Sequence, residues 1–262
     1  MDRIRTVRVV LAVVSLGAFL GASCSSTESE VVATQDIQAG FVATAGSSGS
    51  TRIEATLRSG AKDVELTGGD FLSATTTQPR TAVMIRRRLI TDPQVFGVSY
   101  AREFPGNEKD TLIEITFDRH ATGGISTRNS RVTLPTPFSL HWVSSPVTRE
   151  PAALDFSRSS AEPRFVVWDP DAAPDFEAGD VLGFSITGTC IEPYSGVIDW
   201  EQGEAALELT NRLQDRPPPN DGQTCTVEVE MTLRRNGVVD PAFRAGTFVA
   251  EQVRVFSLLA RP

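Results

Sequence analysis

Histidine and cysteine are scarce in this chain of 262 residues, which contains two histidines and three cysteines. With so few histidine and cysteine side chains as ligands, we expect no structural zinc cluster of the usual kind. The chain also lacks the Gly-x-Ser-x-Gly and His-Glu-x-x-His motifs, and nucleophilic catalysis needs a nucleophile, a base and an orienting acid together. We therefore expect no enzyme and no catalytic residue. The alternative is a hydrolase whose site is built from the loops at 169–180 and 214–224.

Positive charge is also in short supply. Lysine occurs only as Lys62 and Lys109, and the net charge is −8. Without residues 1–23, which hold three arginines and one aspartate, the net charge becomes −10. Neutralising nucleic-acid phosphates or docking on anionic lipid requires an excess of basic side chains on one face. The composition therefore argues against nucleic acid as a partner and against membrane binding through a basic patch.

The first 24 residues have the pattern of an export signal. A basic start with three arginines precedes an apolar run, Val9–Leu20, which is shorter than the roughly 20 residues that a membrane helix needs. Small residues and then Cys24 follow. The stretch resembles the lipobox of bacterial lipoproteins, although Gly21 stands where that motif usually has leucine. The alternatives are an ordinary cleaved secretory signal and an uncleaved anchor.

The lipobox resemblance implies a signal peptide at 1–23 and a lipid on Cys24, which would anchor the protein in the bacterial cell envelope. In that class of protein, Ser25 rather than aspartate after the cysteine favours the outer membrane. The polar stretch at 24–30 is predicted to be a tether, with an ordered first strand as the alternative. A membrane partner reached through lipid is therefore expected, together with an unidentified envelope protein or glycan.

The rest of the chain alternates between apolar and polar residues with a period of two, which indicates strands. Ile113, Ile115 and Phe117, for example, are separated by polar residues. No convincing helix of ten or more residues interrupts the first half. We predict an all-β fold of two β-sandwich domains, at 31–128 and 129–262. Pro135 and Pro137 are expected to mark a kink or a switch between sheets, because proline fits poorly inside a central strand.

Two cysteines lie in register with apolar faces. Cys190 shares its parity with the apolar residues of the strand predicted at 181–190, and Cys225 does so in the strand at 225–233. Both side chains should therefore point inward and meet as a disulfide, which is typical of an oxidising compartment. Closing this loop would stabilise the fold by roughly 3–4 kcal/mol in the chain-entropy model. The alternative is a pair of buried free thiols.

The order Cys190, Trp200, Cys225 resembles the cysteine-tryptophan-cysteine pattern of immunoglobulin domains. It departs from that pattern because Gln223, rather than tyrosine, stands two residues before the second cysteine. The resemblance implies an immunoglobulin-like sandwich in the C-terminal half. Such an architecture does not fix a function.

The densest group of carboxylates lies between two predicted strands. Calcium prefers several oxygen ligands, which alternating acids on a loop supply. The candidate ligands are Asp169, Asp171, Asp175 and Asp180. Ala173 and Pro174 stand where an EF-hand-type loop has a third ligand and a glycine, so the alternative is a solvated acidic loop. We expect no other cofactor.

Three further groups of residues have a structural interpretation beside a functional one. His120 and His141 are expected at the surface or at strand edges. The run at 86–88 is predicted to protect an edge strand by charge, with recognition of a phosphate or carboxylate as the alternative. The three tryptophans are expected in the core, with a glycan-binding platform as the alternative for one of them. The hypothesis that follows is a non-catalytic, lipid-anchored binding, adhesion or assembly module, and a purely structural spacer is a further alternative.

Overall fold

The structure is a computed structural model that describes residues 26–77, 80–88, 98–120, 124–148, 151–153, 155–157, 164–170, 176–199, 206–209 and 222–262. Cys24, Asp171, Asp175 and Trp200 lie outside the described residues. Three sheets arranged in sandwich-like layers make up the fold, so the all-β prediction is confirmed. No helix among the described residues is long and apolar enough to cross a membrane.

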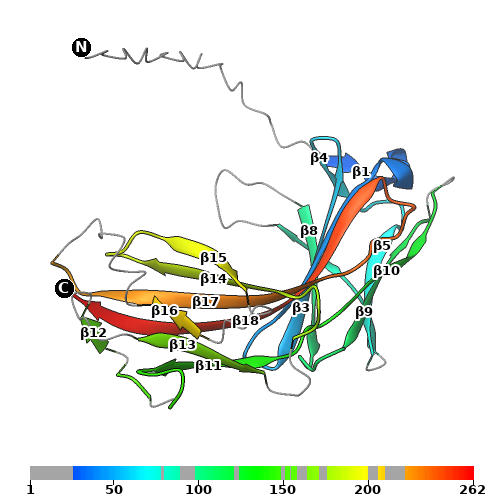
Figure 1. The fold of residues 1–262 in the computed structure, drawn as a ribbon. Helices are drawn as coiled ribbons and strands as arrows, with labels where there is room; N and C mark the ends of the chain where they lie inside the picture. The colour runs from blue at the N-terminus through cyan, green and yellow to red at the C-terminus, as the bar shows by residue number, and fades with distance from the viewer. Residues whose placement is uncertain are drawn as a thin grey trace, which may run out of the picture.

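The largest sheet has 11 strands and runs through the whole molecule (Figure 1). Its main path is β1-β4-β3-β2-β18-β17-β14-β15, with β8 beside β3, β7 beside β8 and β12 beside β18. These strands are β1 Ser26–Glu28, β2 Gln38–Ala45, β3 Ser50–Ser59, β4 Lys62–Glu65, β7 Ile85–Arg88, β8 Val98–Pro105, β12 Asp155–Ser157, β14 Val181–Gly188, β15 Tyr194–Ile198, β17 Cys225–Asn236 and β18 Ala245–Arg261.

Two smaller sheets cover different halves of the large one. The four-stranded sheet has the order β10-β9-β5-β6, and the three-stranded sheet has the order β11-β13-β16. Their strands are β5 Phe71–Thr76, β6 Arg80–Val83, β9 Leu112–Asp118, β10 Thr127–Thr133, β11 Phe138–Val143, β13 Phe165–Pro170 and β16 Ala206–Glu208. Two 3-10 turns, η1 Ser29–Val31 and η2 Thr34–Asp36, precede β2.

The apolar residues that alternate with polar ones in the sequence form two separate cores. The first core lies between the four-stranded sheet and the part of the large sheet formed by β2, β3, β4 and β8. The second lies between the three-stranded sheet and β14, β15 and β17. We call the layers around each core the first and second sandwich. Ile113, Ile115 and Phe117 face the first core as predicted.

Strand β18 serves both sandwiches. Its first half pairs in parallel with β2, with Ala245 opposite Gln38, and contributes Phe248 to the first core. Its second half contributes Leu258 to the second core. Strand β10 lies across the predicted boundary at 128/129 and belongs to the first sandwich. The division into two domains there stays a prediction.

The chain crosses from the first sandwich to the second at 134–137, between β10 and β11, so the predicted sheet switch at Pro135 and Pro137 is confirmed. The buried Gln252 amide donates hydrogen bonds to the carbonyl oxygens of Asn107 and Pro135, at 2.7 and 3.2 Å. Arg254 Nε donates to the carbonyl of Phe138 at 2.7 Å. These long polar side chains of β18 therefore hold the crossover against the large sheet.

The prediction of a tether at 24–30 is wrong for the described residues 26–30. Residues 26–28 form β1, which pairs in parallel with β4, and Ser29 is buried. The sequence looks tether-like because β1 is a short, exposed edge strand whose outward side chains are polar. Strand β7, which carries Arg86, pairs only with β8 among the described strands, and Arg86 forms an ion pair with Glu65. The predicted edge position of the arginine run is therefore confirmed.

Candidate functional site

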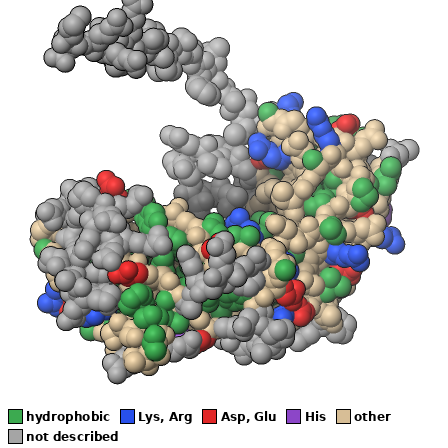
Figure 2. Space-filling model, viewed as in Figure 1, with side chains coloured by type: hydrophobic (Ala, Val, Ile, Leu, Met, Phe, Trp, Pro, Cys, Tyr) green, Lys and Arg blue, Asp and Glu red, His purple; other side chains and the backbone are tan. Residues whose placement is uncertain are grey.

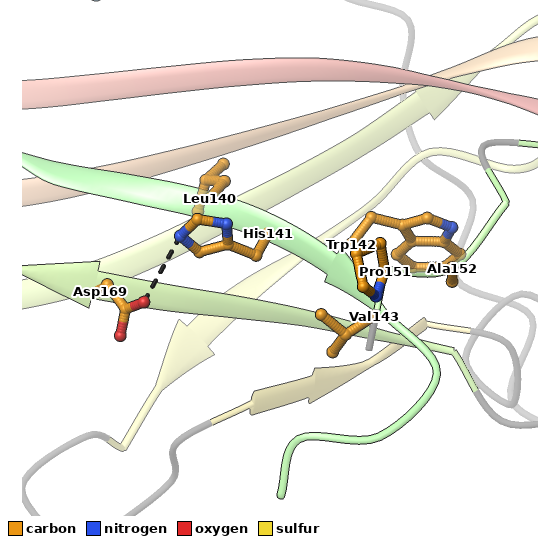
Figure 3. Close-up of a pocket in the computed structure, with 7 residues that line it drawn as sticks. All are labelled: Leu140, His141, Trp142, Val143, Pro151, Ala152 and Asp169. Carbon is orange, nitrogen blue, oxygen red and sulfur yellow. Dashed lines mark ion pairs between the residues drawn. The ribbon is translucent and has the colours of Figure 1, made fainter. Parts of the chain in front are cut away.

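A groove of about 500 Å³ in the second sandwich is the best-formed candidate site (Figure 3). Four consecutive residues of β11 line one wall, and a short segment at 151–152 lines another. The described residues that line it are Leu140, His141, Trp142, Val143, Pro151, Ala152 and Asp169. Because consecutive residues of one strand point to alternate faces, a wall made of four in a row is the edge of that strand.

The backbone of β11 is open along this wall. Trp142 accepts a hydrogen bond at its carbonyl oxygen from the Ala152 N–H at 2.9 Å, and Val143 forms an isolated β-bridge with Pro151. Residues two apart in an antiparallel strand direct their N–H and C=O groups to the same side. The backbone groups of Leu140 therefore face the groove, away from β13. Among the described residues, neither group of Leu140 has a hydrogen-bonding partner on that side.

Trp142 fixes the second wall. Its indole Nε1 donates a hydrogen bond to the carbonyl of Ala153 at 2.7 Å, and its side chain packs into the second core beside the Phe256 ring. A tryptophan that is this deeply buried, at 7% exposure, has no free face for a sugar ring. The glycan-platform alternative therefore does not apply to Trp142. Its role is to hold the 151–153 segment at a fixed distance from β11.

A polar pair closes one end of the groove. His141 Nε2 lies 3.4 Å from Asp169 Oδ2, and both side chains are partly exposed (Figure 3). The pair has the base and orienting acid of a catalytic triad. However, no hydroxyl or thiol group of the described residues forms a hydrogen bond with His141, so a nucleophile is missing from this part of the chain. As it stands, the pair offers one donor and several acceptors to a ligand.

The other predicted site residues take separate places. Cys190 and Cys225 form the predicted disulfide, with Cα atoms 5.7 Å apart. Asp180 is buried and accepts hydrogen bonds from Arg235 on both carboxylate oxygens, at 2.8 and 2.9 Å. Within the described residues, no cluster of three or more histidines, cysteines and acids suits a metal ion. The calcium site predicted at Asp169, Asp171, Asp175 and Asp180 stays a prediction, because Asp171 and Asp175 lie outside the described residues.

Sequence patterns did not identify Leu140, Pro151 or Ala152 as site residues. The groove exists because β11 is an edge strand and because the chain turns back on it at 151–153. Neither feature has a local sequence signal. The signal that did exist is the proline at 151, since proline within a sheet is confined to edges.

The visible faces of the two sandwiches differ in the side chains that they expose. Figure 2 shows acidic and basic side chains interspersed on the visible face of the first sandwich, and apolar side chains between the grey atoms of the second.

Comparisons with known proteins add little about function. No protein family matches the chain, and no curated protein matches it. Among solved structures, the adhesin InvE of Yersinia pseudotuberculosis is similar at 12% sequence identity and a TM-score of 0.23. The similarity covers 87% of this chain and 59% of that one, so the chain spans about three fifths of its length. A likeness this low does not support an inference about function.

Proposed function

We propose that this protein is a non-catalytic, lipid-anchored binding module of the bacterial envelope that holds an extended segment of another protein in the groove beside β11. One observation carries the proposal: the backbone of Leu140, which has no partner on its groove side among the described residues, lies inside an apolar groove. An extended peptide that adds to an open sheet edge gains affinity from main-chain hydrogen bonds and specificity from pockets for alternate side chains.

The chain already contains one backbone hydrogen bond of the kind that a bound segment would make. The Ala152 N–H already bonds the carbonyl of Trp142 at one end of the same edge, so the edge accepts a neighbour in β geometry. A bound segment would continue this line from Trp142 to Leu140, along the wall of the groove that His141 and Asp169 also line. Its apolar side chain would fill the groove, and the polar pair would bind a hydroxyl, amide or amine of the next side chain. A protein that supplies such an extended segment is the kind of unidentified envelope protein that we expect from the sequence.

A substitution that fills the groove with a larger side chain tests the proposal. The mature chain would be screened against an array of extended octapeptides with apolar residues at alternate positions. For peptides that bind, Ala152→Phe should weaken affinity about tenfold or more, because the ring occupies the groove. Val197→Phe, at an exposed position on edge strand β15 of the same sandwich, is the matched control and should leave affinity unchanged.

Hydrogen exchange distinguishes strand addition from other occupants. Peptide binding should slow exchange of the Leu140 amide, because that N–H gains a partner only if the peptide pairs with β11. If Ala152→Phe abolishes binding of a peptide or of a soluble glycan while Leu140 exchanges as before, the groove binds ligands in another way. The strand-addition proposal would then be wrong.

A further inference from the structure

The first described residues are built into the first sandwich. β1 pairs with β4 from Ser26 opposite Asp63 to Glu28 opposite Glu65. Ser29 follows, fully buried, and its hydroxyl oxygen accepts a hydrogen bond from the Thr67 N–H at 3.0 Å. Figure 1 shows β1 and both 3-10 turns together at one end of the first sandwich. We call residues 26–34 the N-terminal clasp.

Arg119 holds this clasp. Its guanidinium donates to the carbonyls of Ser29 and Val32, at 2.7 and 3.1 Å, and to the Thr34 hydroxyl at 3.1 Å. Its Nε lies 2.8 Å from Asp70 Oδ2, and the two side chains are 1% and 0% exposed. An arginine this deeply buried needs all these acceptors. If the clasp left, three of them would be lost, so the clasp cannot swing out as a free tether.

Apolar side chains are exposed beside the clasp. Val31, on η1, is 74% exposed, and Ile125 is 59% exposed. Thr34, three residues after Val31, donates its hydroxyl to the carbonyl of Ile125 at 2.8 Å, so the segments that carry the two side chains meet at this end of the sandwich. Glu28 and Glu30 are also exposed, and so are Arg58 and Lys62 of the neighbouring β3–β4 hairpin, so this end carries charges of both signs.

The short distance between the proposed lipid on Cys24 and the clasp determines which surface this end of the first sandwich faces. Ser25 alone separates Cys24 from Ser26, so the two positions are at most about 7 Å apart. We infer that the end of the first sandwich around the clasp rests directly on the membrane surface, with Val31 and Ile125 against lipid. This inference depends on the proposed lipid on Cys24.

Depth-dependent quenching tests the contact. The lipidated full chain, in phosphatidylcholine vesicles that contain a headgroup-region quencher, would carry a fluorophore on Val31→Cys. The matched control is Val197→Cys, which is similarly exposed, at 71%, on the far sandwich. Quenching at position 31 should be about threefold or more that at position 197, because side chains at the interface enter the headgroup region.

Two variants separate the contact from the anchor. A flexible insertion of about six residues between Ser25 and Ser26 should lower quenching at position 31 toward the control value while the protein still sediments with vesicles. Arg119→Met should do the same by releasing the clasp. Equal quenching at positions 31 and 197 on sedimented protein would overturn the contact and leave the anchor intact. Failure of the unaltered chain to sediment, as expected only of Cys24→Ala, would overturn the anchor and the contact together.

Discussion

The two sandwiches are stabilised by different kinds of interaction. The first is held by buried polar groups that reach between distant segments, namely Arg119 with Asp70, and Asp240 with the N–H groups of Arg128 and Asn129. The second contains the disulfide and the described tryptophans. The first sandwich thus depends on desolvated hydrogen bonds and the second on a covalent link. Their stabilities should respond to different perturbations.

The difference follows from what covers each core. Four strands cover the first core, whereas β11, β13 and the three-residue β16 cover the second. A smaller cover removes less apolar surface from water and stabilises the fold less. A disulfide between Cys190, after β14, and Cys225, at the start of β17, offsets that deficit where the cover is small. The open edge of β11 is a consequence of the same small sheet.

The largest expected effect is the loss of the disulfide. Because the two cysteines are 35 positions apart in the chain, replacing both by alanine should destabilise the second sandwich by about 4 kcal/mol in the chain-entropy model. Tryptophan fluorescence during urea unfolding measures this, because Trp142 and Trp168 both lie in the second core. Hydrogen exchange at Ile53 and Phe117 in the first core is the control. Equal loss of protection there would show that the two cores unfold as one unit.

A smaller effect is expected at the contact between the sandwiches. Arg235 bonds Asp180 beside the second core and also Asp110 and Thr133 of the first sandwich, at 3.2 and 3.3 Å. The hydrogen bond to Asp180 is the main reason that the pKa of Arg235 is raised. Arg235→Met should cost about 1–3 kcal/mol, because the buried Asp180 carboxylate would lose its cation.

The adjacent residue supplies the control. Arg234 pairs with Glu251 at 2.6 Å but is 55% exposed, so Arg234→Met should change the free energy of unfolding by less than about 1 kcal/mol. Urea unfolding of both variants measures the difference. Similar losses from the two substitutions would mean that Arg235 is no more than a surface ion pair.

The sequence predicted the local features of this comparison and missed its long-range ones. Alternation placed Cys190 and Cys225 correctly, because the direction of a side chain in a strand depends only on its parity. The parallel pairing of β18 with β2 joins Ala245 to Gln38, and no local pattern specifies such a partner. The clasp was missed for a similar reason. Its polar residues are ordered by Arg119, which is some 90 positions away in the chain.

The candidate site was the least predictable part. His141 and Asp169 were considered separately, one as an edge residue and the other as a calcium ligand, although their strands are neighbours in the three-stranded sheet. The side chain of Leu140 packs against the second core. What matters at the groove is its backbone, and hydrogen-bonding direction becomes known only when the neighbouring strands are known.

The smallest expected effect is a pH dependence confined to the first sandwich. Burial alone would raise the pKa of Asp240, but hydrogen bonds from the N–H groups of Ala242, Arg128 and Asn129 lower it below the ordinary 3.8. The folded state therefore keeps this carboxylate charged at a pH where the unfolded chain binds a proton. The resulting stability is fully present above about pH 5 and is lost as the pH falls through the lowered pKa.

Asp240→Asn isolates this contribution. The amide has a single acceptor oxygen in place of two, so the variant should be less stable at neutral pH. Its stability should then change less than that of the unaltered chain between pH 5 and pH 3. Exchange of the Arg128 and Asn129 amides, which lie at the irregularity in β10 where the pairing with β9 shifts, reports the loss locally. If the unaltered chain and the variant lose stability in parallel over this range, other carboxylates determine the acid response, and the first sandwich does not depend on Asp240 in the way its buried hydrogen bonds imply.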